Sequence, residues 1–493
     1  MVKNKKDQQK SQPKNYSTIP EHKRQGKKLI PPLVHNFDLT NASWKDDRLP
    51  EMLWAILLVT HLPRENALNV FRKVAKYIED LPDNDQFDDV THTGLSKLPS
   101  EHLDDVLAII TEQQEQKEVL VPLLLFDEFP AREVWTKALN IGKSSDDWTP
   151  LMESVGQTLW HQSQESTDCR WLTVLCLVMA EKLKNAFEDP DERRQWYNEI
   201  LYYPDYGDPS KVRASIRAAE IGTSPSSLNQ SEWAARFWNE CLTKTPCLPL
   251  DTNFAETEIL VGTTEKRLND VYSLLVEHTH DTRTTSDVDA RHDTVFGIGL
   301  YCLSLLQELL RVGNCHAISA RTTLRTIAEC HITLAYLARK DNAELWQSYR
   351  AYGIGQAKLA FLKLDELADE PSYVDVQILE QLANEDMGQE FLNIDLGHWD
   401  STDLRKMSIE AGVKDVYDQF YGWTSTFSHG HWPAIRDVVF DTCGNPLHRL
   451  HRIPRQSPRA LPDVVPDACQ LVDKILEIVS KLYPDFQDRV TLE

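Results

Sequence analysis

The spacing of apolar residues constrains this chain most, because it follows the period of an α-helix in one segment after another. Between residues 64 and 79 the apolar side chains recur at i, i+3, i+4 and i+7, as in Ala67, Val70, Phe71 and Val74. This spacing places them on one face of an amphipathic helix. No stretch shows the alternation of apolar and polar residues that is typical of a half-buried strand. The sequence therefore predicts an all-α fold.

Composition and turn signals predict three parts along the 493 residues. Residues 1–32 are polar and basic, and we expect a disordered tail, with an RNA- or partner-binding arm as the alternative. Residues 33–250 alternate short helical patterns with prolines, which favours an irregular helical array, either solenoid-like or a bundle. Two prolines within 243–251 indicate a boundary. Residues 251–493 are predicted to form a second helical bundle that carries the candidate site.

The charge balance limits the partners that this chain can bind. The net charge is -23, and the first 30 residues hold nine of the basic residues and only two acidic ones, which leaves 44 basic against 74 acidic residues in the remainder. A body this acidic repels nucleic acid, so contact with RNA would need a local basic patch. We expect a partner protein, if there is one, to bind the N-terminal helical domain, and a homodimer is a further expectation.

Cysteine usage and hydropathy predict a cytoplasmic protein without a cofactor. The nine cysteines are scattered, their number is odd, and no C-x2-C pair occurs, which argues against a disulfide framework or a zinc ribbon. No window approaches eighteen consecutive apolar residues, so we expect no membrane span. The segment 278–293 is rich in His and Asp but lacks the spacing of a metal site, and no metal is predicted.

The predicted helix 317–339 holds the first group of candidate residues. At about 100° per residue, Arg321, Arg325 and Glu329 follow one another at 40° steps beside the apolar face. One interpretation is an i,i+4 Arg–Glu pair that stabilises the helix slightly. The other is an anion or phosphate site, because an arginine next to a core is costly unless it has a binding partner or a function. His331 falls on the apolar face, which favours a core histidine, although it also forms an Arg-x5-His spacing with Arg325.

Two later segments supply the remaining candidates. The pattern over 402–428 predicts a single helix, and Ser428-His429-Gly430-His431 lies at its end. His429 is either a charged residue at the helix end or, like His431, an acid–base group that titrates near neutral pH. Residues 448–459 then carry four arginines and no acid, which indicates either a solvated loop or a phosphate-contact patch. These arginines are Arg449, Arg452, Arg455 and Arg459.

The region over about residues 270–440 resembles an uncharacterised family of bacterial all-helical domains. The resemblance rests on the Arg-x3-Glu helix and on a later element that comprises Tyr417, Tyr421, Ser425 and Ser428–Gly430. The region is also loosely similar to HEPN domains, in which an Arg-x(4–6)-His pair cleaves RNA without a metal, and the Arg-x5-His spacing fits that pattern. The resemblance implies a helical bundle and a metal-independent ribonuclease activity.

Two functional hypotheses follow. In the first, the chain is a ribonuclease- or toxin-type effector of a bacterial stress or phage-defence system. Arg321 and Arg325 then hold the scissile phosphate and Glu329 orients Arg325. His429 or His331 deprotonates a 2′-hydroxyl or protonates the leaving oxygen. In the second, the chain is a non-catalytic scaffold or partner-binding protein, and these residues form structural networks. The first hypothesis expects Arg325, Glu329 and His429 to converge in one open cleft.

Overall fold

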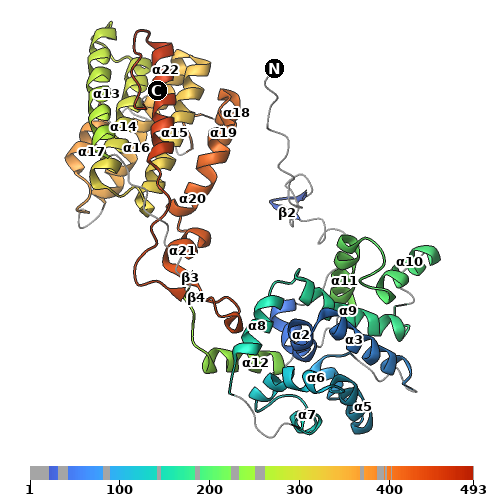
Figure 1. Ribbon diagram of the computed structural model, residues 1–493. Helices are drawn as coiled ribbons and strands as arrows, with labels where there is room; N and C mark the ends of the chain where they lie inside the picture. Colours follow the sequence, from blue (N-terminus) through green and yellow to red (C-terminus); the bar gives the residue numbers. More distant parts are fainter. Residues whose placement is uncertain are drawn as a thin grey trace, which may run out of the picture. The chain divides into compact units, whose positions relative to one another are not determined.

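The computed structural model describes residues 22–30, 43–81, 89–140, 146–183, 189–223, 232–249, 261–366, 371–385, 394, 397–400 and 402–491. The chain divides into two compact units (Figure 1). The N-terminal unit comprises Met1–Leu250 together with a returning segment, Thr442–Arg452, and the C-terminal unit comprises Asp251–Asp441 and Ile453–Glu493. The chain passes from the N-terminal to the C-terminal unit after residue 250. Its later return to the N-terminal unit was not predicted from the sequence.

Short helices build the N-terminal unit. They are, in chain order, η2 (Trp44–Arg48), η3 (Leu49–Met52), α2 (Leu53–His61), α3 (Arg64–Glu79), α4 (His92–Leu95), α5 (Ser100–Ile110), α6 (Gln114–Val119), η5 (Val121–Leu125), α7 (Arg132–Leu139), α8 (Thr149–Thr158), α9 (Gln164–Met179), α10 (Pro190–Leu201), α11 (Pro209–Thr223), α12 (Glu232–Lys244) and, from the returning segment, η10 (Pro446–His448). Helix α2 is apolar on all sides and packs against α3, α8 and α9, so it lies inside the core. Leu447 of η10 is buried in the same core.

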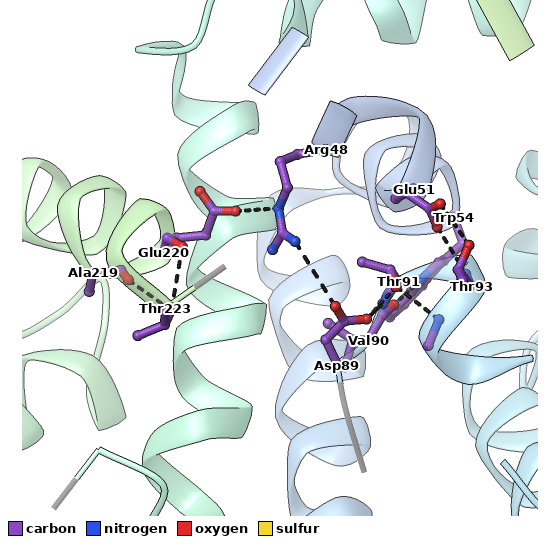
Figure 2. A network of polar contacts seen from close by, with 11 residues as sticks. Arg48, Glu51, Trp54, Asp89, Val90, Thr91, Thr93, Ala219, Glu220 and Thr223 are labelled. Carbon is purple, nitrogen blue, oxygen red and sulfur yellow. Dashed lines mark hydrogen bonds and ion pairs between the residues drawn. The ribbon is translucent and has the colours of Figure 1, made fainter. Parts of the chain in front are cut away.

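A buried polar network joins three parts of this unit. Figure 2 shows Arg48, at the end of η2, between Glu220 of α11 and Asp89. Its Nε lies 2.6 Å from Glu220 Oε1, and its Nη1 lies 4.0 Å from Asp89 Oδ2. Arg170 of α9 also faces Glu220, at 3.6 Å, and its guanidinium lies 4.6 Å above the ring of Trp44. Burial lowers the pKa of Arg170 to about 10. Buried charges of this kind are tolerated because each has a partner of opposite sign.

The C-terminal unit is a bundle of longer helices. They are α13 (Val261–Thr282), α14 (Ala290–Val312), α15 (Ile318–Lys340), α16 (Ala343–Asp365), α17 (Val376–Ala383), α18 (Leu404–Ala411), α19 (Lys414–Val416), the π-helical η9 (Tyr417–Tyr421), α20 (Gly422–Ser428), α21 (Trp432–Val439) and α22 (Val465–Leu482). Helix α15 packs against α14, α18, η9, α20 and α22. It therefore lies at the centre of the unit.

The all-α prediction is confirmed. In the described ranges the strands are limited to two two-stranded sheets, β1 (Lys23–Gln25) with β2 (Lys28–Ile30) and β3 (Phe440–Thr442) with β4 (Arg452–Pro454). The first sheet is antiparallel and lies inside the segment expected to be a disordered tail. Gly26, with φ +59°, supplies the turn between its strands. The tail residues 1–21, 31 and 32 lie outside the described residues.

The predicted helix over 402–428 is wrong as a single element. Gly412 takes φ +78° and ends α18, and the chain then continues as α19, η9 and α20. An α-helix needs φ near −60°, and the left-handed region favours glycine. The expectation for 317–339 matches α15 to within one residue. By length and composition α14 could cross a membrane, but 50 % of its most apolar window is buried inside the bundle.

Candidate functional site

Arg321, near the start of α15, is engaged by backbone carbonyls. Its side chain donates hydrogen bonds to the carbonyl oxygens of Cys315 (3.1 Å), Ala317 (3.4 Å) and Pro462. Only 6 % of the residue is exposed, and burial lowers the pKa of its guanidinium to about 10. Arg321 therefore ties the turn before α15 to the segment before α22, and most of its donors are used.

Arg325 lies one turn further along α15 and joins that helix to η9. Its Nη2 lies 2.9 Å from Glu329 Oε1 and donates to the Tyr421 hydroxyl at 3.2 Å. The guanidinium carbon is 5.0 Å from the centre of the Tyr421 ring. The Nε of Arg325 is buried without a hydrogen-bond partner. The predicted i,i+4 pair is thus present, and the guanidinium keeps unused donor capacity.

His331 belongs to the core side of α15. It is 3 % exposed and lines a cavity of about 450 Å³ formed with α22 and the α18–α19 turn. Burial, assisted by the charge of Lys474, lowers its pKa to about 4. The imidazole is therefore neutral at pH 7, and its Nδ1 has no hydrogen-bond partner.

His429 and His431 lie at the turn between α20 and α21. Both are exposed, and their rings stack with centres 5.7 Å apart. His429 follows Tyr421 by eight residues, which is about 12 Å along a helix. Among the described residues, no hydrogen bond, ion pair or ring contact joins either histidine to Arg325 or Glu329. Within the described part of the chain, the predicted acid–base histidines therefore make no direct contact with the arginine that would hold a phosphate.

The arginines of 448–459 are divided between the two units, and acidic side chains face three of them. Arg449 pairs with Asp46 at 3.0 Å and lies over the Trp238 ring in the N-terminal unit. In the C-terminal unit, Arg455 pairs with Asp441 and Arg459 pairs with Asp437. Arg452 donates to Thr442 Oγ1. Most of the positive charge expected for a phosphate-contact patch is thus neutralised locally.

Helix α21 has buried and exposed apolar side chains on adjacent parts of one face. Ala434 and Val438 are buried with Phe427 and Leu461 in a small core of their own. Beside them on the helix surface, Trp432, Ile435 and Val439 are 58 %, 40 % and 38 % exposed. Their i, i+3, i+7 spacing forms one stripe. This exposed apolar face was not predicted from the sequence.

Four metal-ligating side chains meet in the N-terminal unit. They are Cys247, Cys443, His448 and His451, and their ligand atoms all lie within 4.8 Å of one another. Burial, with His451 nearby, lowers the pKa of His448. The only local signal in the sequence is Cys443-x4-His448-x2-His451, and the missing cysteine lies almost two hundred residues earlier.

The His- and Asp-rich segment 278–293 makes protein contacts of other kinds. His278 Nε2 lies 3.2 Å from the Tyr483 carbonyl oxygen, and His292 Nε2 lies 3.1 Å from Thr282 Oγ1. Asp293 pairs with Arg350 at 3.0 Å. These side chains hold helices of the bundle together.

Comparison with known protein families identifies a similarity within the C-terminal unit. A model for a family of unknown function (DUF5677) matches residues 301–445. No curated protein and no solved structure matches the chain. The matched range contains both α15 and the η9–α20 segment, which Arg325 and Tyr421 connect. The chain is therefore similar, over this range, to a family without an assigned activity.

Proposed function

We propose that this chain is a non-catalytic scaffold that assembles through its C-terminal unit, by packing the exposed apolar face of α21 against the same face of a second copy. The observation that carries the proposal is the exposure of Trp432, Ile435 and Val439 on a helix whose adjacent apolar side chains already lie in a core. A contiguous apolar stripe that extends beyond the buried face and stays exposed marks an interaction surface.

The chemistry of this face favours a protein over RNA. Tryptophan is enriched among the residues that dominate binding energy in protein interfaces. RNA would instead need free positive charge beside the aromatic rings. The neighbouring Arg459 and Arg455 are paired with Asp437 and Asp441, so they add little net charge.

A second copy is the occupant that fits the geometry of the stripe. When two copies of α21 pack about a two-fold axis perpendicular to the helix, they run antiparallel. The three residues of one stripe then meet the same three residues of the other stripe in reverse order. Each apolar side chain of the stripe then faces an apolar side chain of the second copy, as in an isologous interface.

Sedimentation velocity of the full chain over a concentration series tests the proposal. We expect wild type to dimerise, and Trp432→Asp to weaken the dimer by about 30-fold or more, since loss of a central tryptophan costs about 2 kcal/mol or more. Tyr373→Asp is the matched control, because Tyr373 is 84 % exposed on another part of the unit. A wild-type protein that stays monomeric into the high micromolar range contradicts the proposal.

The second candidate function is metal-independent RNA cleavage of the HEPN type. It is favoured by the unused donor capacity of Arg325, within the range that matches the family model. In this function Arg325 holds the scissile phosphate. His429 deprotonates the 2′-hydroxyl or protonates the leaving oxygen after a rearrangement that brings it to Arg325.

Incubation of the protein with total RNA in EDTA separates the two functions. If the chain is a ribonuclease of this type, the wild-type protein cleaves RNA, and the Arg325→Ala and His429→Ala variants do not. Expression of the wild-type protein in cells is then toxic. His429 is exposed, so its replacement leaves the fold intact. Absence of both cleavage and toxicity, or equal cleavage by all three proteins, excludes this candidate.

A further inference from the structure

Two segments far apart in the chain bring thiols and imidazoles together in the N-terminal unit. Cys247 follows α12, whereas Cys443, His448 and His451 come from the returning segment. The Cys247 sulfur lies 3.3 Å from His451 Nε2 and 3.6 Å from His448 Nδ1, two residues that are 204 and 201 positions away. The Cys443 sulfur lies 3.4 Å from His448 Nδ1.

These separations match the edges of a tetrahedral zinc site. Zinc binds sulfur at about 2.3 Å and nitrogen at about 2.0–2.1 Å, so neighbouring sulfur and nitrogen ligands lie about 3.5 Å apart. The three sulfur–nitrogen distances are between 3.3 and 3.6 Å. Hence these three donor pairs already have the separations that one shared ion imposes, and all four donor atoms lie within 4.8 Å of one another.

The backbone around the cluster holds the donors in place. Pro249 and Cys443 form an antiparallel bridge, and the Leu248 amide donates to the Cys443 sulfur at 3.4 Å. The Cys443 amide donates to the carbonyl of His451 at 2.9 Å. An amide that donates to a cysteine sulfur stabilises the thiolate, which is the form that binds a metal.

A second layer of contacts orients His448. Its Nε2 lies 2.9 Å from Thr245 Oγ1, which itself accepts a hydrogen bond from Asn445 Nδ2 at 3.0 Å. When Nε2 carries the proton and donates to Thr245, the lone pair of Nδ1 faces the two sulfurs. Metal-binding histidines are commonly fixed by such a contact through the other ring nitrogen.

We propose that Cys247, Cys443, His448 and His451 bind one zinc ion, and that this ion fastens the returning segment to the N-terminal unit. Two sulfur and two nitrogen donors favour zinc over oxygen-seeking ions such as magnesium or calcium. Four protein ligands fill the tetrahedron and leave no position for a substrate, so the site is structural. The proposal does not depend on the function proposed for the C-terminal unit.

Metal analysis of the full chain, purified without chelators, tests the site. We expect about one zinc per chain in wild type and a loss of bound zinc in Cys443→Ser and His451→Ala, as set by four-ligand coordination. Cys330→Ser and His161→Ala replace a half-buried cysteine and an exposed histidine outside the cluster, and should keep the zinc.

Cobalt(II) binding and thiol alkylation test the site on the wild-type protein, so they remain informative if a cysteine variant fails to fold. Cobalt added to the zinc-free wild type should give the intense visible bands of tetrahedral coordination with sulfur-to-cobalt charge transfer. Cys247 is exposed, so it should be alkylated quickly only after a strong chelator has removed the metal. Wild type that binds neither zinc nor cobalt, or a Cys247–Cys443 disulfide found by peptide mapping under non-reducing conditions, overturns the proposal.

Discussion

Glu220 holds together the buried charges of the N-terminal unit. It is 2 % exposed and faces both Arg48 and Arg170. Glu220→Gln keeps the shape but leaves two buried guanidinium groups short of negative charge, so we expect the free energy of unfolding to fall by about 3 kcal/mol. Urea unfolding followed by tryptophan fluorescence measures the change.

The control for this substitution is Glu232→Gln in α12. Glu232 is 84 % exposed and pairs with Arg236 at the surface. Its replacement should change the free energy of unfolding by less than about 0.5 kcal/mol. Equal effects of the two substitutions would mean that the buried network contributes little.

His331 makes the stability of the C-terminal unit depend on pH. Its folded pKa, about 4, is below the ordinary histidine value of 6.5. The unfolded chain therefore binds the extra proton first. The contribution of neutral His331 to the free energy of unfolding is fully present above pH 6.5 and is lost as the pH falls from 6.5 towards 4. At pH 5 the loss relative to pH 7 is about 2 kcal/mol.

The variant His331→Leu tests this dependence. Since Nδ1 of His331 has no hydrogen-bond partner, leucine removes the titration without breaking a hydrogen bond at that atom. We expect the difference in melting temperature between pH 7 and pH 5 to be smaller in the variant than in wild type. An unchanged difference would show that His331 is protonated equally in both states.

At the scale of single residues, local interactions were predictable and distant ones were not. The Arg325–Glu329 pair follows from helix spacing alone. Its partner Tyr421 and the carbonyl of Pro462 that binds Arg321 depend on how helices pack, and spacing along the chain does not encode that packing. For the same reason no metal ligand was predicted from the sequence.

Among the elements, the long helices were the most predictable. The strong apolar period of 317–339 defined α15 almost to the residue, because a buried face is read directly from the spacing. The break within 402–428 was missed, since one glycine within a helical pattern is compatible with both continuation and termination. Only the positive φ of Gly412 decides between them.

Two glycines in this region should respond to alanine in opposite directions. An added Cβ would meet nothing within 4 Å at either Gly412 or Gly422, so the backbone alone decides. At Gly412, with φ +78°, alanine should cost about 1 kcal/mol. At Gly422, which has helical angles, alanine should add about 0.4–1 kcal/mol of stability. Thermal unfolding of both variants checks the signs, and a shift in the same direction for both would contradict this account.

At the scale of the whole molecule, each unit has its own core, and we expect two unfolding transitions. The proposed zinc site lies entirely within the N-terminal unit. Because a bound metal stabilises only the folded state that holds it, a strong chelator should lower the melting temperature of one transition and leave the other unchanged. Differential scanning calorimetry, with excess zinc added back as the control, measures both transitions.

The return of Thr442–Arg452 to the N-terminal unit also has a consequence for biosynthesis. When residue 250 leaves the ribosome, the first unit still lacks the core residue Leu447 and the partners that Cys247 meets in the returning segment. At about 5–20 residues per second, translation of the intervening stretch takes roughly 10 to 40 s. During that interval the nascent N-terminal unit is incomplete, and it is then that chaperones and proteases of the cell would encounter it.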